Sequence, residues 1–431
     1  MDVLSENFIE NDELNVPIAD DFSIGCAEYV DDVMTCTLGK ANQNKVLTRV
    51  DEFAKINKLE WGEEKCQVMQ VGRKVKVPNT WALGTKNIAN TTSYKYLGDL
   101  ITNDGKNKAN IENRFNRTQG IIRQINTTAG SEIMRHIETK TILDLYERCV
   151  IPSFLNNAES WTLSTAEEKE LDKLGIRILK RLFNLPERTP SPALIYSFGT
   201  LYITQEIDQM KFMYLYKILK REDHHWTKKM LHHLKSLNIG WTKVIQDKLY
   251  DYNLEQDFDK IKDMTKTNWK TLVKTAILNK NKEKLLESCI EQTQNGVKVK
   301  TKTAHIHKKL ESDAYSPAPL TELISSNKIE TKTIILSRNG MLTCGSNFKA
   351  TIPEVCRECQ LVDNENHRLN QCPQWQDTNF ANSDTIVEFK DVFSDDKQKL
   401  SQIIKRIQQV WELHVGNGAM KRNPLVSQIN R

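Results

Sequence analysis

The chain has 431 residues, of which 39% are hydrophobic and 27% are charged, and its formal net charge is +5. This length allows two or three domains with substantial cores. The sequence contains no run of about 18 apolar residues and begins with acidic residues, which argues against a transmembrane helix and a signal peptide. We therefore expect an intracellular, non-secreted protein with nine reduced cysteines, in which sequons such as Asn90-Thr91-Thr92 carry no glycan.

The charge is distributed unevenly along the chain. Residues 1–32 hold ten acidic side chains and no lysine or arginine, so the remainder carries +15. A chain with this distribution could follow a phosphate backbone with everything except its first segment. Lysine-rich helices can also be no more than well solvated, so the charge supports nucleic-acid binding without specifying it. Residues 1–22 show no clear period and are expected to be a disordered acidic lead-in.

The first structured element expected is a β-hairpin around Tyr29-Val30-Asp31-Asp32. Strand-forming residues occupy 22–27 and 33–38 on either side of this acidic centre. At the tip of the hairpin, the neighbouring carboxylates of Asp31 and Asp32 could hold Mg²⁺, which takes its other ligands from water and substrate phosphates. Asp also favours turns through its own hydrogen bonds, so such a pair alone is more often simply solvated.

A helix and two strands are expected after the hairpin. Residues 42–58 have the apolar spacing of an amphipathic helix that packs on a sheet. Residues 59–69 are expected to form a turn and then a strand that is led by Lys65. A further strand over residues 94–101 contains Tyr96-Leu97-Gly98 and closes at the Asn103-Asp104-Gly105 turn. The expected helix face comprises Val46, Leu47, Val50, Phe53, Ala54 and Asn57.

This order of motifs resembles the later palm motifs of reverse transcriptases from non-LTR retrotransposons. The resemblance implies that Asp31 and Asp32 are the catalytic pair that binds Mg²⁺, with Mn²⁺ as an alternative. It also implies that Tyr29 and Lys65 lie near the incoming nucleotide, although a solvated lysine at a strand end is about as common. The segment beside the primer-holding strand would be Tyr96, Leu97 and Gly98.

Basic helices are expected over residues 106–200. Segment 152–163 resembles the Leu-Tyr-Gly-x-Glu-x-Trp segment of the same elements, but Asn156-Asn157 stand where the family has Tyr-Gly, which suggests a drifting sequence. Ser164 and Glu167 predict a capping box at the start of the next helix. In the family this region follows or forms the thumb that grips the template–primer duplex. The expected core stripe is Leu171, Leu174, Ile178 and Leu182, and the basic faces carry Lys169, Lys173, Arg177, Lys180 and Arg181.

Residues 201–310 are helical and lysine-rich, with 22 Lys and Arg against 13 Asp and Glu. Basic residues interleaved with aromatic residues suit the binding of single strands by stacking. Aromatic residues at helical spacing are more often core residues, and we favour that interpretation. The pairs His224-His225 and His232-His233 are expected to be surface or hydrogen-bonded residues rather than metal ligands. The aromatic residues are Phe212, Tyr214, Tyr216, Trp226, Trp241 and Trp269.

A second specific site is the pattern Cys356-x₂-Cys359-x₇-His367-x₄-Cys372. Three thiolates and one imidazole form a closed tetrahedral set for Zn²⁺ and leave no position open for catalysis. Nine cysteines could produce this spacing by coincidence, yet a structural zinc site is the better interpretation. The pattern also resembles the Cys-Cys-His-Cys finger downstream of the polymerase in the same retrotransposons.

Other residues around this pattern have less specific roles. Arg357, His367 and Arg368 are candidate contacts to nucleic acid, and Cys344 is expected to be a free thiol. Residues 396–414 have the spacing of a final amphipathic helix, with one apolar face made of Leu400, Ile403, Ile407, Val410 and Trp411.

The chain as a whole is expected to be an α+β protein, mostly α-helical, with a partial right-hand polymerase palm, a helical thumb and connector, and a small zinc-binding module. The expected domains are the lead-in (1–22), a partial palm (23–105), a thumb-like region (106–190), a basic helical connector (191–330), a zinc-finger module (331–380) and a C-terminal helix with its tail (381–431).

The resemblance covers only the rear part of the family's protein. A two-metal polymerase needs a third carboxylate from a neighbouring strand, and in the family this Asp and the fingers lie upstream. Only 28 residues precede Tyr29, so we expect a fragment of an RNA-directed DNA polymerase that is inactive alone. Its expected partners are an RNA template and a DNA primer or target, in the nucleus and cytoplasm, without a membrane. The alternatives are a non-enzymatic nucleic-acid-binding protein that uses the zinc finger and basic helices, and a decayed copy with no retained role.

Overall fold

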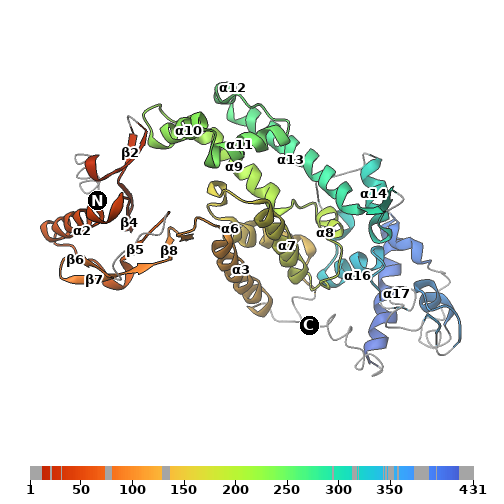
Figure 1. The fold of residues 1–431 in the computed structure, drawn as a ribbon. Helices are drawn as coiled ribbons and strands as arrows, with labels where there is room; N and C mark the ends of the chain where they lie inside the picture. The colour runs from red at the N-terminus through yellow and green to blue at the C-terminus, as the bar shows by residue number, and fades with distance from the viewer. Residues whose placement is uncertain are drawn as a thin grey trace. The chain divides into compact units, whose positions relative to one another are not determined.

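Helices dominate the described part of the chain, and its strands form small sheets, so the prediction of a mostly helical α+β protein is confirmed (Figure 1). The computed structural model describes residues 12–19, 22–30, 32–72, 80–128, 136–293, 296–312, 318, 320–342, 344, 347, 354–356, 359–372, 388–394 and 396–416. Among them, no helix combines the length and apolar character that crossing a membrane requires.

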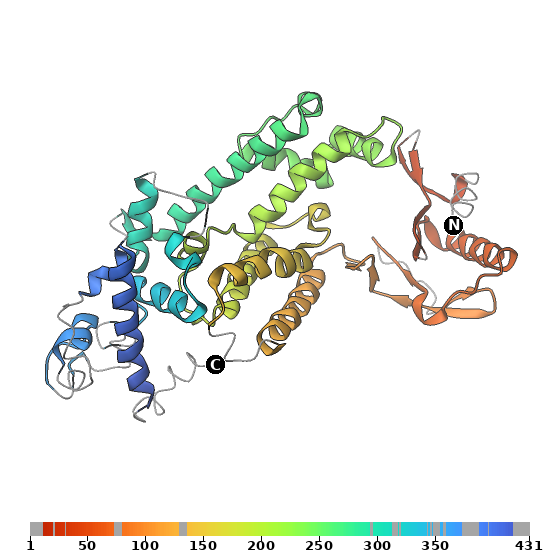
Figure 2. The same ribbon diagram turned by 180° about the vertical axis from the view of Figure 1, so that it is seen from behind.

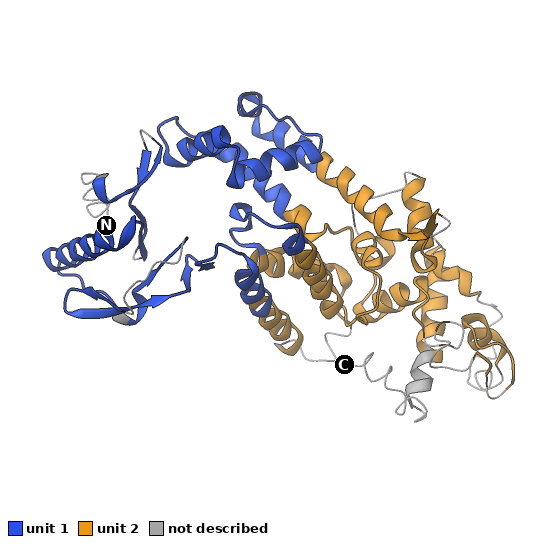
Figure 3. Cartoon of the chain, in the orientation of Figure 1, with its two compact units in different colours: residues 1–116, 155–168, 207–274 blue, residues 117–154, 169–206, 275–431 orange. Residues whose placement is uncertain are grey.

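The chain divides into two compact units, each built from three separate segments (Figure 3). Unit 1 comprises residues 1–116, 155–168 and 207–274, and unit 2 comprises residues 117–154, 169–206 and 275–431. The serial domains expected from the sequence have other boundaries than these units, and they stay a prediction.

Unit 1 begins with short antiparallel pairs of strands. β1 pairs with β2, β3 with β4, and β8 with β9, while β7 lies between a parallel β5 and an antiparallel β6. The bounds are β1 (Val16–Ala19), β2 (Phe22–Ile24), β3 (Cys26–Tyr29), β4 (Asp32–Thr35), β5 (Gln67–Met69), β6 (Thr80–Leu83), β7 (Lys86–Thr91), β8 (Ser93–Tyr96) and β9 (Asp99–Thr102).

A single long helix, α2 (Gly39–Ile56), provides one side of the core beneath these strands. Its predicted apolar face is confirmed except for Asn57, which is exposed and caps the helix. Leu14 belongs to the same core, and the lead-in was therefore wrongly predicted to be disordered over residues 12–19, which form a 3-10 helix (Asp12–Leu14) and β1. The buried cluster is Leu14, Val46, Leu47, Val50, Phe53, Trp81, Leu83 and Ile88.

Two predicted strands are divided in the structure. The run over residues 22–27 is divided at Gly25, a position where a Cβ atom would lie 1.8 Å from Oδ1 of Asn15 and where only glycine therefore fits. The predicted strand over residues 94–101 is a hairpin, β8–β9, in which Tyr96 pairs with Asp99. The turn expected next is present, since the Gly105 amide donates to the Thr102 carbonyl at 3.0 Å.

The helices of unit 1 bury three of the six aromatic residues that were predicted to be core, Phe212, Tyr216 and Trp269, while Tyr214 and Trp241 are half-buried. Phe212 and Trp269 are fully buried, and Nε1 of Trp269 donates to the Phe212 carbonyl at 3.0 Å. Trp226 is exposed instead. Helices lying wholly or partly in this unit are α3 (Lys108–Thr128), α7 (Thr165–Leu182), α9 (Ile203–Leu219), α10 (Trp226–Leu237), α11 (Gly240–Asp251), α12 (Phe258–Asp263) and α13 (Lys266–Cys289).

Unit 2 is built around α7, whose predicted apolar stripe is buried. Gly175 allows the start of α9 to approach, because a Cβ atom there would lie 2.2 Å from Cγ1 of Ile203. The prediction that Lys180 belongs to the basic face was wrong, because its side chain is buried and donates to the Glu187 carbonyl. Burial lowers the pKa of Lys180. The buried stripe is Leu171, Leu174, Ile178 and Leu182.

The remaining elements of unit 2 pack α16 beside α17, and both views show them side by side (Figures 1 and 2). The predicted final helix is confirmed, with Leu400, Ile403, Ile407 and Val410 buried. The bounds are α5 (Thr139–Leu145), a π-helix (Tyr146–Val150), α6 (Ile151–Leu155), α8 (Ser191–Phe198), β10 (Ile290–Thr293), β11 (Gly296–Val299), α14 (Ala304–Glu311), α15 (Thr321–Ile324), α16 (Lys328–Arg338) and α17 (Lys397–Gly416).

Candidate metal centre and hairpin site

The first two predicted zinc ligands lie on one tight loop. An isolated antiparallel bridge pairs Val355 with Val362, and within it the Cys356 amide donates to the Leu361 carbonyl at 2.8 Å. Gln360 closes the loop in the left-handed region, at φ 61°. This local geometry keeps Cys356 and Cys359 on the same knuckle, as expected of the Cys-x₂-Cys spacing.

The other two ligands flank one turn of π-helix, His367–Gln371. Its defining hydrogen bond runs from the Cys372 amide to the His367 carbonyl, at 2.9 Å. Five residues would place two side chains on different faces of an α-helix, whereas the wider π turn brings positions i and i+5 to the same side. The π turn therefore directs His367 and Cys372 toward the knuckle.

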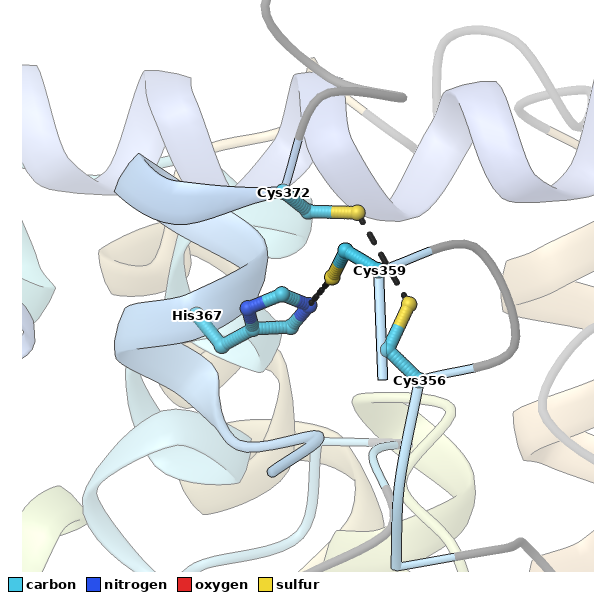
Figure 4. A group of neighbouring side chains, drawn as sticks. All are labelled: Cys356, Cys359, His367 and Cys372. Carbon is cyan, nitrogen blue, oxygen red and sulfur yellow. Dashed lines mark hydrogen bonds between the residues drawn. The ribbon is translucent and has the colours of Figure 1, made fainter. Parts of the chain in front are cut away.

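The four side chains converge on a common point (Figure 4). All four ligand atoms lie within 4.8 Å of one another. Sγ of Cys356 and Sγ of Cys372 are 3.8 Å apart, and Sγ of Cys359 is 3.3 Å from Nε2 of His367. A tetrahedral zinc ion with ordinary bond lengths separates two sulfurs by about 3.8 Å and a sulfur from a nitrogen by about 3.5 Å. The group can therefore hold a metal such as zinc.

Burial and protonation also suit a structural metal. His367 and Cys372 are each 1% exposed. Burial lowers the pKa of His367, which favours the neutral imidazole that binds metal. Four protein ligands complete a tetrahedral shell, so an ion held here would have no position open to a substrate.

Arg368, a predicted nucleic-acid contact, is instead engaged inside this module. Its guanidinium makes two hydrogen bonds of 2.6 Å to the carboxylate of Asp363, and both side chains are buried. The prediction was wrong because the sequence shows the charge but not this bidentate partner. His367 is likewise buried among the ligands, and Arg357 lies outside the described residues.

The module is attached to neighbouring parts of unit 2 by hydrogen bonds between backbone groups and side chains. The Leu369 carbonyl accepts a hydrogen bond of 3.2 Å from Arg406 of α17. The amide of Phe389 donates to the side chain of Asn366 at 3.0 Å. Cys344 is buried, forms no disulfide and lies outside the ligand set.

The acidic hairpin lies in unit 1. Tyr29 and Asp32 form the last pair of the β3–β4 ladder, so the connecting loop has two residues. Asp32 is thus the first residue of β4 rather than part of the turn, and Asp31 lies outside the described residues. Val30 lies at φ 57°, a strained conformation for a β-branched residue, and is 76% exposed.

Strand β8 is hydrogen-bonded both to this hairpin and to the segment of Lys65. Oη of Tyr96, on β8, donates to the Ala27 carbonyl of β3 at 3.3 Å. Oη of Tyr94 donates to the carbonyl of Lys65 at 2.9 Å. Burial and then the charge of Asp32 raise the pKa of Tyr96. Hydrogen bonds thus join the three predicted motifs, which sequence order alone does not require.

The hairpin is less complete than the cysteine cluster. Among the described residues, no group of three or more potential metal-ligating side chains includes Asp32. Tyr29 and Lys65 are exposed, so both are accessible to a ligand.

Leu97 and Gly98 form the two-residue turn between β8 and β9, with φ values of 48° and 92°. The sequence did not single out Asp99 and Arg114 as supports of this turn, although their side chains lie 2.6 Å apart. A third support of this turn is Asn157. The sequence carries a signal for it, because Asn157 stands where the resembling segment has glycine, and its φ of 57° is a conformation that glycine adopts readily.

Compared with known protein families and with curated proteins, the chain matches no family model and no curated sequence. What the two sites can do must therefore be inferred from their own residues and geometry.

Proposed function

We propose that this chain is part of a non-LTR reverse transcriptase, carrying the metal-binding hairpin, the primer-holding turn, a thumb-like helical region and a structural zinc module. The observation that carries the proposal is that one strand of unit 1, β8, is hydrogen-bonded to both the acidic hairpin and the Lys65 segment. Tyr96 bonds to the strand that leads into the acidic turn, and Tyr94 bonds to the carbonyl of Lys65. Solvated surface features have no reason to be hydrogen-bonded to one another, so these bonds between distant segments favour a shared site.

The chemistry of such a site is nucleotidyl transfer on an RNA template. Mg²⁺ held by adjacent carboxylates stabilises the developing charge of the phosphoryl group. In this chain Asp31 and Asp32 would hold the ion, and Lys65 would offer positive charge to the phosphates of the nucleotide. Tyr29 would lie beside the nucleotide at the exposed tip of the hairpin, where it is 62% exposed.

Polymerisation requires a further carboxylate that bridges the ions. None of the described residues joins Asp32 in a group of three ligands. We therefore expect the chain alone to bind template and primer without extending the primer. The charge of +15 carried after residue 32 supports binding of a nucleic-acid backbone. On α7, Lys169 and Lys173 are exposed and could contact phosphates.

Two measurements test the proposal. The first is binding of an RNA–DNA primer–template by fluorescence anisotropy at increasing salt, where affinity should fall steeply as counterions are released. Binding that is absent, or insensitive to salt, would contradict the proposal. The second is primer extension with Mg²⁺, compared with Asp31→Ala/Asp32→Ala. Extension that the double substitution abolishes would overturn the expected inactivity of the chain alone.

A second candidate function is a non-enzymatic nucleic-acid-binding protein that uses the zinc module and basic helices. The observation that favours it is the complete Cys₃His set, whose four ligand atoms already lie within 4.8 Å of one another. In that case Cys359→Ser should weaken nucleic-acid binding strongly, while Asp31→Ala/Asp32→Ala should leave it unchanged. Cys149→Ser is the matched control, because Cys149 is an exposed thiol outside the set.

A further inference from the structure

The turn between β8 and β9 is strained and exposed. Both Leu97 and Gly98 have positive φ, as a type I′ turn requires, and Leu97 is 39% exposed. Glycine adopts this conformation without cost, whereas leucine does so only where the surroundings impose it. Asn at the first position would normally support such a turn, so leucine leaves the support to other segments.

That support converges on Asp99, the first residue after the turn. Oδ1 of Asp99 accepts hydrogen bonds from Arg114 at 2.6 Å and from Asn110 at 2.8 Å. Oδ2 accepts a hydrogen bond of 3.0 Å from Nδ2 of Asn157. The carboxylate thus joins β9 to α3 and to the segment before α7.

The same side chains also hold the backbone of the turn itself. Arg114 donates to the Gly98 carbonyl at 3.3 Å, and Nδ2 of Asn157 donates to the Leu97 carbonyl at 3.4 Å. Each central carbonyl of the turn therefore has a donor from a distant part of the chain. Because charge-assisted bonds to buried groups are strong, Asp99 and Arg114 can hold the backbone in this conformation.

Asn157 is suited to this role by its own backbone. Its φ of 57° is the left-handed conformation, which glycine adopts freely and which asparagine tolerates best among other residues. The family segment that this stretch resembles has glycine here, so Asn157 keeps the conformation and adds an amide that reaches Asp99. The asparagine is therefore compatible with the backbone conformation that this position requires.

The segment that carries Asn157 is fixed from its other side. Nζ of Lys211, a buried lysine of α9, donates to the carbonyls of Ala158 at 3.5 Å, Glu159 at 3.4 Å and Trp161. Nε1 of Trp241 donates to the Glu159 carbonyl at 2.7 Å. A support attached so firmly to the helices of unit 1 can set the position of the turn.

We propose that Asn157 and Asp99 form a positioning clamp that presents the exposed Leu97–Gly98 turn to the backbone of a bound primer strand. Neither residue contacts nucleic acid, and both act through the turn. The inference rests on the proposed function for its ligand, while the clamp itself rests on the contacts around Asp99.

Asn157→Gly tests the clamp without disturbing the backbone, because glycine accepts the same φ and only the amide is lost. We expect the amide hydrogens of Leu97, Gly98 and Asp99 to exchange about tenfold faster, since the bonds from Asn157 to the Leu97 carbonyl and the Asp99 carboxylate disappear. We expect the affinity for an RNA–DNA primer–template to fall about fivefold. The thermal midpoint of unit 1 should change little.

Asn238→Gly is the matched control. Asn238 lies at φ 52° and is exposed at the end of α10, in the same unit. We expect this substitution to leave both the exchange of the turn and the affinity unchanged.

The outcomes separate the clamp from the proposed function. Unchanged exchange at the turn in Asn157→Gly would overturn the clamp. Faster exchange with unchanged affinity would overturn the role of the turn in binding. If the wild-type chain bound no primer–template at any salt concentration, the proposed function would fail, and the exchange measurement would still decide whether the clamp exists.

Discussion

The candidate zinc module and the acidic hairpin depend on the sequence in different ways. The four ligands of the module lie within one short stretch of sequence, and a knuckle and a π turn bring them together. The hairpin instead depends on segments that are far apart, such as Tyr96 and Ala27. Local spacing therefore predicts the first site fully and the second only in outline, because long-range contacts do not leave a regular pattern in sequence.

The largest effect should follow loss of a zinc ligand. Cys372→Ser removes one of four ligands from a group whose metal binding is expected to stabilise the local fold by about 10 kcal/mol. We expect loss of bound zinc, measured by atomic emission, and loss of exchange protection over residues 359–372. Cys149→Ser should change neither, since that thiol is exposed and outside the group. Full protection without zinc would show that the module folds on packing alone.

A distant contact can be tested at Gly175, where a Cβ atom would lie 2.2 Å from Cγ1 of Ile203. Gly175→Ala should lower the free energy of unfolding by about 2 kcal/mol, because overpacking forces α7 and the start of α9 apart. The matched control is Gly120→Ala in α3, which meets no atom within 4 Å. It should stabilise by about 0.5 kcal/mol through helix propensity, and equal effects in urea unfolding would contradict the packing argument.

The stability of the protein should depend on pH through Glu206, a buried acid that the fold places near Glu147. Burial, and then the charge of Glu147, raises the pKa of Glu206 to about 7. Since this exceeds the ordinary value of 4.5, the stability that the group contributes is full below pH 4.5 and is lost as pH rises through about 7. Glu206→Gln should therefore be more stable than wild type by about 2 kcal/mol at pH 8 and equal to it at pH 4.5.

Urea unfolding at the two pH values measures this difference. Glu147→Gln is a useful comparison, because removing the neighbouring charge should give a smaller stabilisation of the same sign. A gain in Glu206→Gln that is the same at both pH values would indicate better packing rather than relief of a buried charge.

The smallest effect is expected at a helix cap that the sequence predicted. Ser164 and Glu167 form the capping box of α7, with the Ser164 amide donating to Glu167 at 2.8 Å. Ser164→Ala should cost about 1 kcal/mol of stability. Thr165→Ala, at the next and exposed position, should cost less than half of this in the same unfolding experiment. A larger loss at Thr165 would contradict the assignment of the cap.

The same contrast explains how much the sequence predicted. The apolar faces of α2, α7 and α17 follow helical periodicity, and the structure buries them. The division of the strand at Gly25 and the hairpin within residues 94–101 depend on contacts with Asn15, Asn110 and Asn157, which no local pattern contains. Lys180 and Arg368 were misassigned because their buried partners are set by the fold.

The most direct test of the central claim uses Mn²⁺ as a paramagnetic replacement for Mg²⁺, with primer–template present. If the hairpin binds metal beside the primer-holding segment, Mn²⁺ should broaden the NMR signals of Tyr29, Asp32 and Tyr96 before those of other acidic regions. The broadening should disappear in Asp31→Ala/Asp32→Ala. Broadening that is spread evenly over the surface, or that persists in the double variant, would contradict a polymerase-like metal site.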